Sequence, residues 1–132
     1  MKTGNLQRRW QEKRPAVFDK ETRIVCLDII QESQKDEDGN ERDGFSFIPV
    51  EIDRQIDYGH IKSQLIEAGF AQKDEFGLLM NAVDGILTAV SSSDSWEDFK
   101  QNIDTEDIKI FSDFCDFRRM CAEAAKEVMN QY

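Results

Sequence analysis

The sequence lacks the motifs of common catalytic and cofactor-binding sites. It contains neither the G-x-S-x-G of a nucleophile elbow nor the glycine-rich loops that bind nucleotide phosphates. Its single histidine, His60, belongs to no recognisable nucleophile–base motif, and no C-x-x-C pair is present to bind zinc. We therefore predict a protein that is not an enzyme and that has no cofactor and no metal site.

Long apolar runs are also absent. No segment approaches the roughly 18 consecutive apolar residues of a membrane helix, and no apolar stretch follows the first basic residues, so we expect neither a membrane partner nor a signal peptide. The three cysteines, Cys26, Cys115 and Cys121, are an odd number in apolar surroundings, which favours buried thiols in a reducing compartment. The expected location is the host cytoplasm or a virion assembled there.

Charge divides the chain unequally. Residues 1–20 have a net charge of +4, whereas residues 21–132 have a net charge of −14. We predict a flexible basic arm over residues 1–16 and a single domain over residues 17–132. The arm is interpreted either as a frayed polar terminus or as an anchor built around Trp10. The acidic body is not expected to bind nucleic acid directly.

Two segments rich in β-branched and aromatic residues predict a β-hairpin at about 22–53. The segment 35–44 between them has two glycines and many small polar residues, which is typical of a solvated loop. In the second strand Phe45 and Phe47 point to the same side. Because Pro49 has no N–H, we expect a free edge or a bulge there, and a free edge could accept a strand from a partner.

Beyond residue 57 the apolar period changes from 2 to 3.6 residues, which predicts three or four helices up to residue 131. Asp57 and Ser95 are predicted helix N-caps. The last helix has an apolar face so broad that it must pack against the hairpin, other helices or another chain. The predicted fold class is α+β, with an N-terminal hairpin packed against C-terminal helices. The second helix carries a stripe of large apolar side chains: Phe76, Leu79, Met80, Val83, Ile86, Leu87 and Val90.

The acidic loop partly matches the pattern of a calcium-binding loop. Asp36, Asp38 and Asn40 have the spacing of the first three EF-hand ligands. However, Glu41 stands where the EF-hand needs glycine, and Phe47 stands where it needs a bidentate glutamate. We therefore predict no calcium site in this loop.

A second acidic region lies within residues 94–116, where eight carboxylates are spread along predicted helices. The plain interpretation is a solvated, solubilising surface. Spaced carboxylates can also resemble the phosphates of nucleic acid. The alternative function is therefore an acidic inhibitor protein that occupies a nucleic-acid-binding groove of a host protein, in the manner of an anti-defence protein.

Four segments resemble parts of a known class of proteins. They are residues 48–51, with the sequence IPVE, and residues 58–66, 69–79 and 111–127. Together they resemble short proteins encoded among the structural and tail genes of phages and prophages of gut bacteria, over about residues 45–127. Relative to that class, residues 84–104 look like an insertion, and residues 1–15 have no counterpart.

The resemblance implies a virion, tail or assembly accessory protein and transfers no functional residue. We therefore expect a phage-encoded structural or assembly protein that acts through protein–protein contacts, with other virion or assembly proteins or with further copies of itself. The sequence does not specify the partner, the stoichiometry or the position in a particle. The candidate partner-binding residues are Arg8, Arg9, Trp10, Arg14, Phe45 and Phe47.

Overall fold

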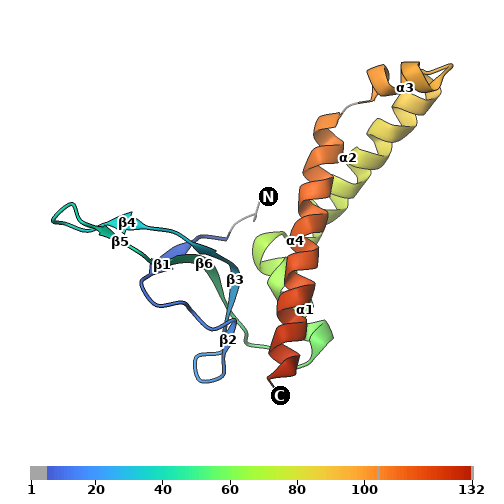
Figure 1. Cartoon of the computed structure of the whole chain (residues 1–132). Coiled ribbons are helices and arrows are strands. Elements are labelled where there is room, and N and C mark those ends of the chain that lie inside the picture. Colours follow the sequence, from blue (N-terminus) through green and yellow to red (C-terminus); the bar gives the residue numbers. More distant parts are fainter. Residues whose placement is uncertain (1–5, 104, 132) are drawn as a thin grey trace.

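The computed structural model describes residues 6–103 and 105–131. Figure 1 shows a β-rich end joined to a long helical projection. The α+β prediction is confirmed, with four helices following the strands. In chain order the elements are β1 (Arg9–Gln11), β2 (Phe18–Asp19), β3 (Ile24–Gln31), β4 (Gln34–Lys35), β5 (Glu41–Arg42), β6 (Phe45–Glu51), α1 (Tyr58–Gly69), α2 (Gln72–Ser91), α3 (Trp96–Asn102) and α4 (Thr105–Asn130).

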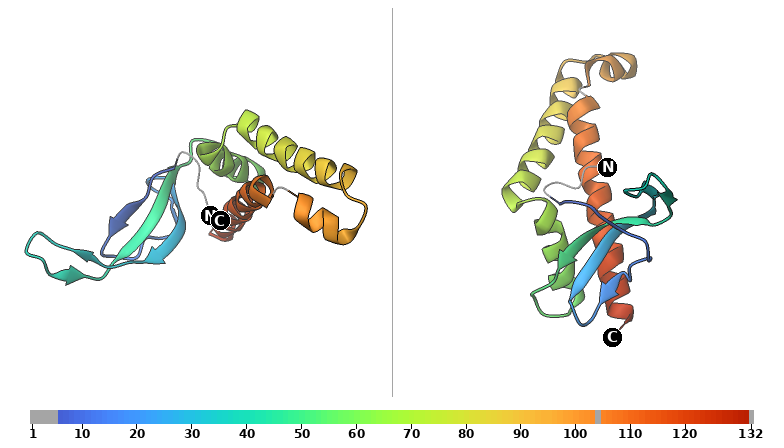
Figure 2. Two further views of the ribbon diagram at one scale, coloured as in Figure 1. Left: turned by 90° about the horizontal axis from the view of Figure 1, so that it is seen from above. Right: turned by 90° about the vertical axis from the view of Figure 1, so that its left-hand side faces the viewer.

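The predicted hairpin is formed by β3 and β6, which pair antiparallel at the centre of a sheet with the order β1-β6-β3-β2. Val25 pairs with Val50 and Leu27 with Ile48, so their side chains share one face of the sheet. All four of these side chains are buried. Beyond this sheet the chain continues into a small β4–β5 ribbon that projects away from the helices (Figures 1 and 2).

The N-terminal segment differs from the predicted flexible arm. Residues 9–11 form β1, which pairs with β6 from Arg9↔Phe47 to Gln11↔Phe45. β1 therefore occupies part of the β6 edge, at residues 45–47, whereas the sequence predicted a free edge or a bulge at Pro49, further along the strand. β2 occupies part of the β3 edge, and the register shift of the hairpin lies in β3 between Leu27 and Ile30. The three residues of β1 are too few to show a strand period in the sequence, so their pairing depends on contacts with distant residues. Residues 1–5 of the predicted arm lie outside the described residues.

The buried core lies between one face of the sheet and the helices α1 and α4. Phe114 and Phe117 of α4 are almost fully buried and meet the ring of Phe70 edge-on, with ring centroids 4.9 and 5.2 Å apart. This arrangement fixes α4 against the end of α1, and the N-terminal half of α4 pairs with α2 (Figure 2). The core residues are Phe18, Val25, Leu27, Ile48, Val50, Ile52, Ile61, Leu65, Ile66, Phe114, Phe117, Cys121, Ala124, Ala125 and Val128.

Two helix starts follow the sequence prediction. The Asp57 side chain accepts a hydrogen bond from the backbone N–H of His60 at 3.0 Å, and the Ser95 side chain accepts one from Asp98 at 3.2 Å. Both residues have extended backbones that precede the first helical turn. The prediction that Asp57 and Ser95 are N-caps is therefore confirmed.

The Asp57 cap predicts a pH dependence of stability. The backbone N–H of His60, followed by the His60 side chain, lowers the pKa of the Asp57 carboxyl. An aspartate in the unfolded chain has a pKa of about 3.9. The stabilisation from the ionised Asp57 carboxylate is therefore fully present above that pH, and it is lost as the pH falls through the lower pKa of the folded state. Urea unfolding of wild type and Asp57→Asn from about pH 2 to about pH 6 should show a steeper acid loss for wild type. Parallel curves would contradict this assignment.

Candidate functional site

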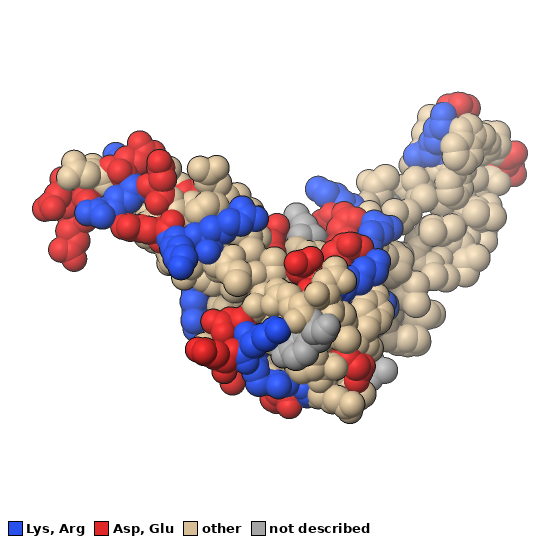
Figure 3. Space-filling view, turned by 60° about the horizontal axis from the view of Figure 1, so that its bottom comes forward, with Lys and Arg blue, Asp and Glu red and all other residues tan. Residues whose placement is uncertain are grey.

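Helix α2 turns its small side chains toward the protein and its large apolar side chains toward solvent. Ala82 and Ala89 are buried on the side where α2 contacts α4. Figure 3 shows few charged side chains on the visible face of the helical projection to which α2 belongs. A helix normally buries its largest apolar residues. On α2 the buried residues are alanines, and of the large apolar side chains Leu78 is half-buried against the core while the others are exposed. The exposed fractions are 64% for Phe76, 40% for Leu79, 46% for Met80, 37% for Val83, 41% for Ile86, 59% for Leu87 and 56% for Val90.

The attachment of α2 to α4 explains why these large side chains stay outside. Alanines on the inner side permit a close approach of the two helices, which leaves little room between them for larger groups. Near the start of α2, Glu75 accepts a hydrogen bond from Arg118 of α4 at 2.5 Å. The exposed stripe is therefore a surface that α4 does not cover.

Charge is sparse along the same helix. Asp84 is the only charged residue between positions 76 and 93. A monomer rarely exposes a contiguous apolar patch larger than about 300–600 Å², and patches of that size commonly mark interaction sites. Within the described residues, none of the helices combines the length and the hydropathy of a membrane span. We therefore take the exposed stripe on α2, defined by the seven residues above, as the candidate functional site and call it the α2 face.

The tip of the projection adds one further exposed aromatic side chain. Trp96 is 65% exposed and stacks on Phe99 with ring centroids 5.4 Å apart. The ammonium of Lys100 lies 5.4 Å from the Trp96 ring centroid, a cation–π distance. The amide of Asn102 donates to Ser93 at 3.0 Å and so connects α3 to the end of α2. Trp96 thus extends the exposed apolar surface beyond α2.

The predicted anchor Trp10 is held by the sheet. Its indole N–H donates to the carbonyl oxygen of Glu32 at 2.8 Å, and its ring lies against the backbone of Gly44. Arg8 is also held: its guanidinium donates to the Asp28 carbonyl and to the Ser46 hydroxyl, both at 3.1 Å, and pairs with the Asp28 carboxylate. Trp10 and Arg8 therefore fasten the N-terminal segment to the sheet.

The remaining candidate residues lie around the outer face of the sheet. Phe47 is buried, with 6% exposed, and lies in the lining of a groove of about 570 Å³ that Arg9 and Arg14 also line. Arg14 lies 5.6 Å from the ring centroid of Phe45, which is half-buried. The structure thus brings these four residues near one another, but the aromatic rings contribute little exposed surface for a partner.

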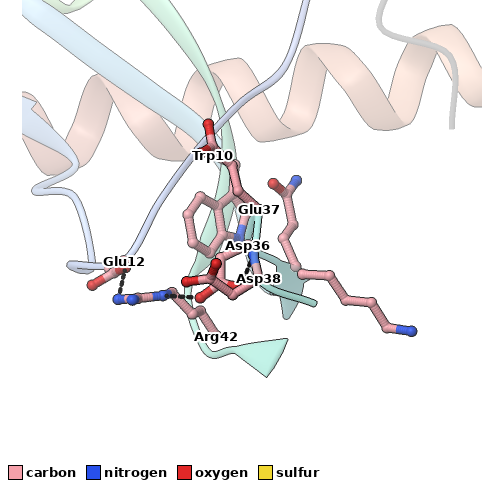
Figure 4. Close-up of a pocket in the computed structure, with 8 residues that line it drawn as sticks. Trp10, Glu12, Asp36, Glu37, Asp38 and Arg42 are labelled. Atoms are coloured by element: carbon pink, nitrogen blue, oxygen red, sulfur yellow. Dashed lines mark hydrogen bonds and ion pairs between the residues drawn. The ribbon is translucent and has the colours of Figure 1, made fainter. Parts of the chain in front are cut away.

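Figure 4 shows a shallow pocket beside the β4–β5 ribbon, at the loop that has part of the EF-hand spacing. Asp36 accepts hydrogen bonds from the backbone N–H groups of Asp38 and Asn40 and from Arg42 at 3.0 Å. Arg42 first, and the backbone donors after it, lower the pKa of Asp36. Arg42 also pairs with Glu12 at 3.1 Å. These carboxylates serve the turn itself, and no cluster of three or more metal-ligating side chains occurs in the described ranges.

The cysteines differ in burial, which predicts their reactivity. Burial raises the pKa of Cys121 to about 12 and also raises the pKa of Cys26, to which Asp19 adds a smaller effect. Cys115 is only half-buried. A thiol reagent added to the native protein should therefore label Cys115 first, and denatured protein should react at all three sites. Cys115→Ser should remove the fast phase, whereas rapid labelling of two thiols in the native protein would contradict the prediction.

Comparison of the chain with protein-family models, curated proteins and solved structures gives no match. The inference of function therefore depends on the surfaces of the chain itself. The α2 face was visible in the sequence as a stripe but was not among the candidate partner-binding residues. Three features of the sequence indicate this face: large apolar residues on one side of the predicted helix, small residues such as Ala82 and Ala89 next to them, and almost no charge.

Proposed function

We propose that this chain is a non-catalytic structural or assembly protein, of the kind encoded in phage structural gene clusters, and that it acts through protein–protein contacts. The observation that carries the proposal is the α2 face, a row of seven large apolar side chains left uncovered on a projecting helix. Surfaces of this composition are typical of protein–protein interfaces. The expected location is a virion or the host cytoplasm in which it assembles.

The alternative function, an acidic inhibitor, has weaker support. At least two of the eight carboxylates in the region 94–116 have a cation beside them: Glu97 pairs with Lys100 at 3.5 Å and Asp116 with Arg119 at 2.8 Å. Pairing of this kind interrupts a continuous negative surface. The two functions also differ in their response to salt, since binding through an acidic face weakens steeply as ionic strength rises, whereas apolar contacts are nearly insensitive.

Genetic complementation tests the proposal. The coding sequence would be deleted from its native genome, and wild type, Leu87→Glu or Thr88→Glu would be supplied in trans. Leu87 is 59% exposed on the α2 face, whereas Thr88 is exposed on another side of the same helix. We expect wild type and Thr88→Glu to restore particle assembly and Leu87→Glu to fail, as judged by electron microscopy and infectious titre. Normal particles in the absence of the chain would contradict an assembly function.

A further inference from the structure

We infer that the α2 face binds the α2 face of a second copy of this chain, with the two helices antiparallel about a two-fold axis at Val83. This inference rests on the proposed function, because it names the partner of the same surface. The product is a homodimer in which two α2 helices lie between two α4 helices.

The first argument is the symmetry of the apolar pattern. Large apolar residues stand three, four and seven positions on either side of Val83, and Val83 itself is the central one. A two-fold axis through Val83 that reverses the helix direction therefore superposes the pattern on itself. Such self-complementarity is what an isologous interface requires. The resulting pairs are Phe76 with Val90, Leu79 with Leu87, Met80 with Ile86, and Val83 with Val83 of the second copy.

The second argument is the angular position of these residues on the helix. At about 100° per residue, all seven lie within roughly 60° of Val83 around the helix axis. Ala82 and Ala89, which are buried, lie to one side of this arc. The exposed polar residues Asn81 and Thr88 lie on the opposite side of the helix from the arc. A second helix can therefore pack along the arc without displacing α4.

The third argument is area. A fully exposed large apolar or aromatic side chain presents on the order of 150–250 Å², and the seven residues are between 37% and 64% exposed. The α2 face therefore offers roughly 600 Å² per copy, close to the ~800 Å² per partner of a standard interface.

Charge favours a second copy over a membrane. Helices that lie on membrane surfaces carry several Lys or Arg residues on their polar face. Within α2 the sequence has one lysine and three acidic residues, Asp74, Glu75 and Asp84. An unrelated protein partner would need a complementary stripe of its own, whereas the symmetric pattern supplies the complement from the chain itself.

The first experiment measures the mass of the full chain in solution by size-exclusion chromatography with light scattering. Wild type and Thr88→Glu should have twice the monomer mass of 15.3 kDa. Leu87→Glu buries a carboxylate in the apolar interface and should weaken association on the order of 100-fold. Circular dichroism establishes that Leu87→Glu is folded, as expected for a substitution at an exposed position. A wild-type chain that remains monomeric at about 100 μM would have a Kd of at least that order, and this result would overturn the inference.

The second experiment tests the antiparallel axis by disulfide cross-linking in a Cys115→Ser background. Val83→Cys should cross-link to its own copy because the axis passes through it. Phe76→Cys and Val90→Cys should each fail alone and should cross-link when mixed. Self-cross-linking of Phe76→Cys and of Val90→Cys would show a parallel pair and would overturn the proposed arrangement.

The outcomes separate this inference from the proposed function. A monomeric chain whose Leu87→Glu variant still fails to support particle assembly would refute the dimer and leave an assembly function with another partner. A monomeric chain that floats with vesicles of neutral or anionic phospholipid, and loses this binding in Leu87→Glu, would refute the dimer in favour of a membrane surface. A dimer that dissociates in Leu87→Glu, together with normal particles in the absence of the chain, would support the dimer and refute the assembly function.

Discussion

Phe117→Ala is expected to lower the free energy of unfolding by about 3–5 kcal/mol. Phe117 is fully buried in the core and packs edge-on against Phe70. Its removal leaves a cavity between α4 and α1, since a packed interior relaxes only partly around a lost side chain. Because a domain of this size is stable by only about 5–15 kcal/mol, the loss is a large fraction of the total.

Urea unfolding followed by far-UV circular dichroism measures this loss. Phe117→Leu is the matched control, because it keeps much of the volume and should cost clearly less than the alanine variant. A variant that is unfolded in buffer would be the extreme form of the expected result. A loss below about 1 kcal/mol for Phe117→Ala would mean that α4 does not dock through this residue.

Gly44→Ala is the substitution with the next largest expected effect. A methyl group at residue 44 would overlap Cζ2 of the Trp10 ring and would lie 2.6 Å from Cε2 of that ring and 2.6 Å from the carbonyl oxygen of Gln11. Both residues belong to β1, so the strand must shift away from β6. We expect a loss of about 1–3 kcal/mol, toward the upper end because a backbone carbonyl cannot rotate away. Trp10 fluorescence during urea unfolding, measured in a Trp96→Phe background, reports directly on this contact.

Two comparisons isolate the cause of the Gly44→Ala effect. A methyl group at Gly59 meets only the Asp57 carboxylate at 3.5 Å, an ordinary contact, so Gly59→Ala should be close to neutral. In a Trp10→Ala background, Gly44→Ala should cost less than in wild type, because one of the two clashes is gone. Equal costs in the two backgrounds would show that Trp10 does not pack on Gly44.

Local signals predicted the centre of the sheet and the helix caps. The β3–β6 hairpin follows from β-branched runs on both sides of a polar loop, and the Asp57 and Ser95 caps follow from side chains that bond to nearby backbone. These features depend on residues close together in the chain. The sequence therefore contains most of the information needed to place them.

The strand β1 and the role of Trp10 depend on distant residues and could not be predicted in the same way. Trp10 binds Glu32 and packs on Gly44, which are more than twenty residues away. A short basic segment with one tryptophan is compatible with a free arm as well as with an edge strand. The structure shows the edge strand, because Gly44 has no side chain and so leaves room for the Trp10 ring on the sheet.

The exposed state of α2 also required the structure. Hydrophobic periodicity identifies which side of a helix is apolar, but it does not say what covers that side. The sequence showed the stripe around Val83, and we expected contacts with a partner on the sheet and the N-terminal segment instead. The burial of Ala82 and Ala89 against α4 places the larger residues outside.

The position of the core has a consequence for how the molecule loses structure. Among the described residues, all the buried members of the core cluster come from the sheet end, α1 and the part of α4 from Phe114 onward, and none from α2 or α3. Elements with few buried apolar contacts open locally at a lower free energy than the whole domain. In a single copy, the distal turns of α2 and α3 would therefore fray while the sheet stays intact. A melting midpoint recorded from the sheet would describe only that end of the molecule.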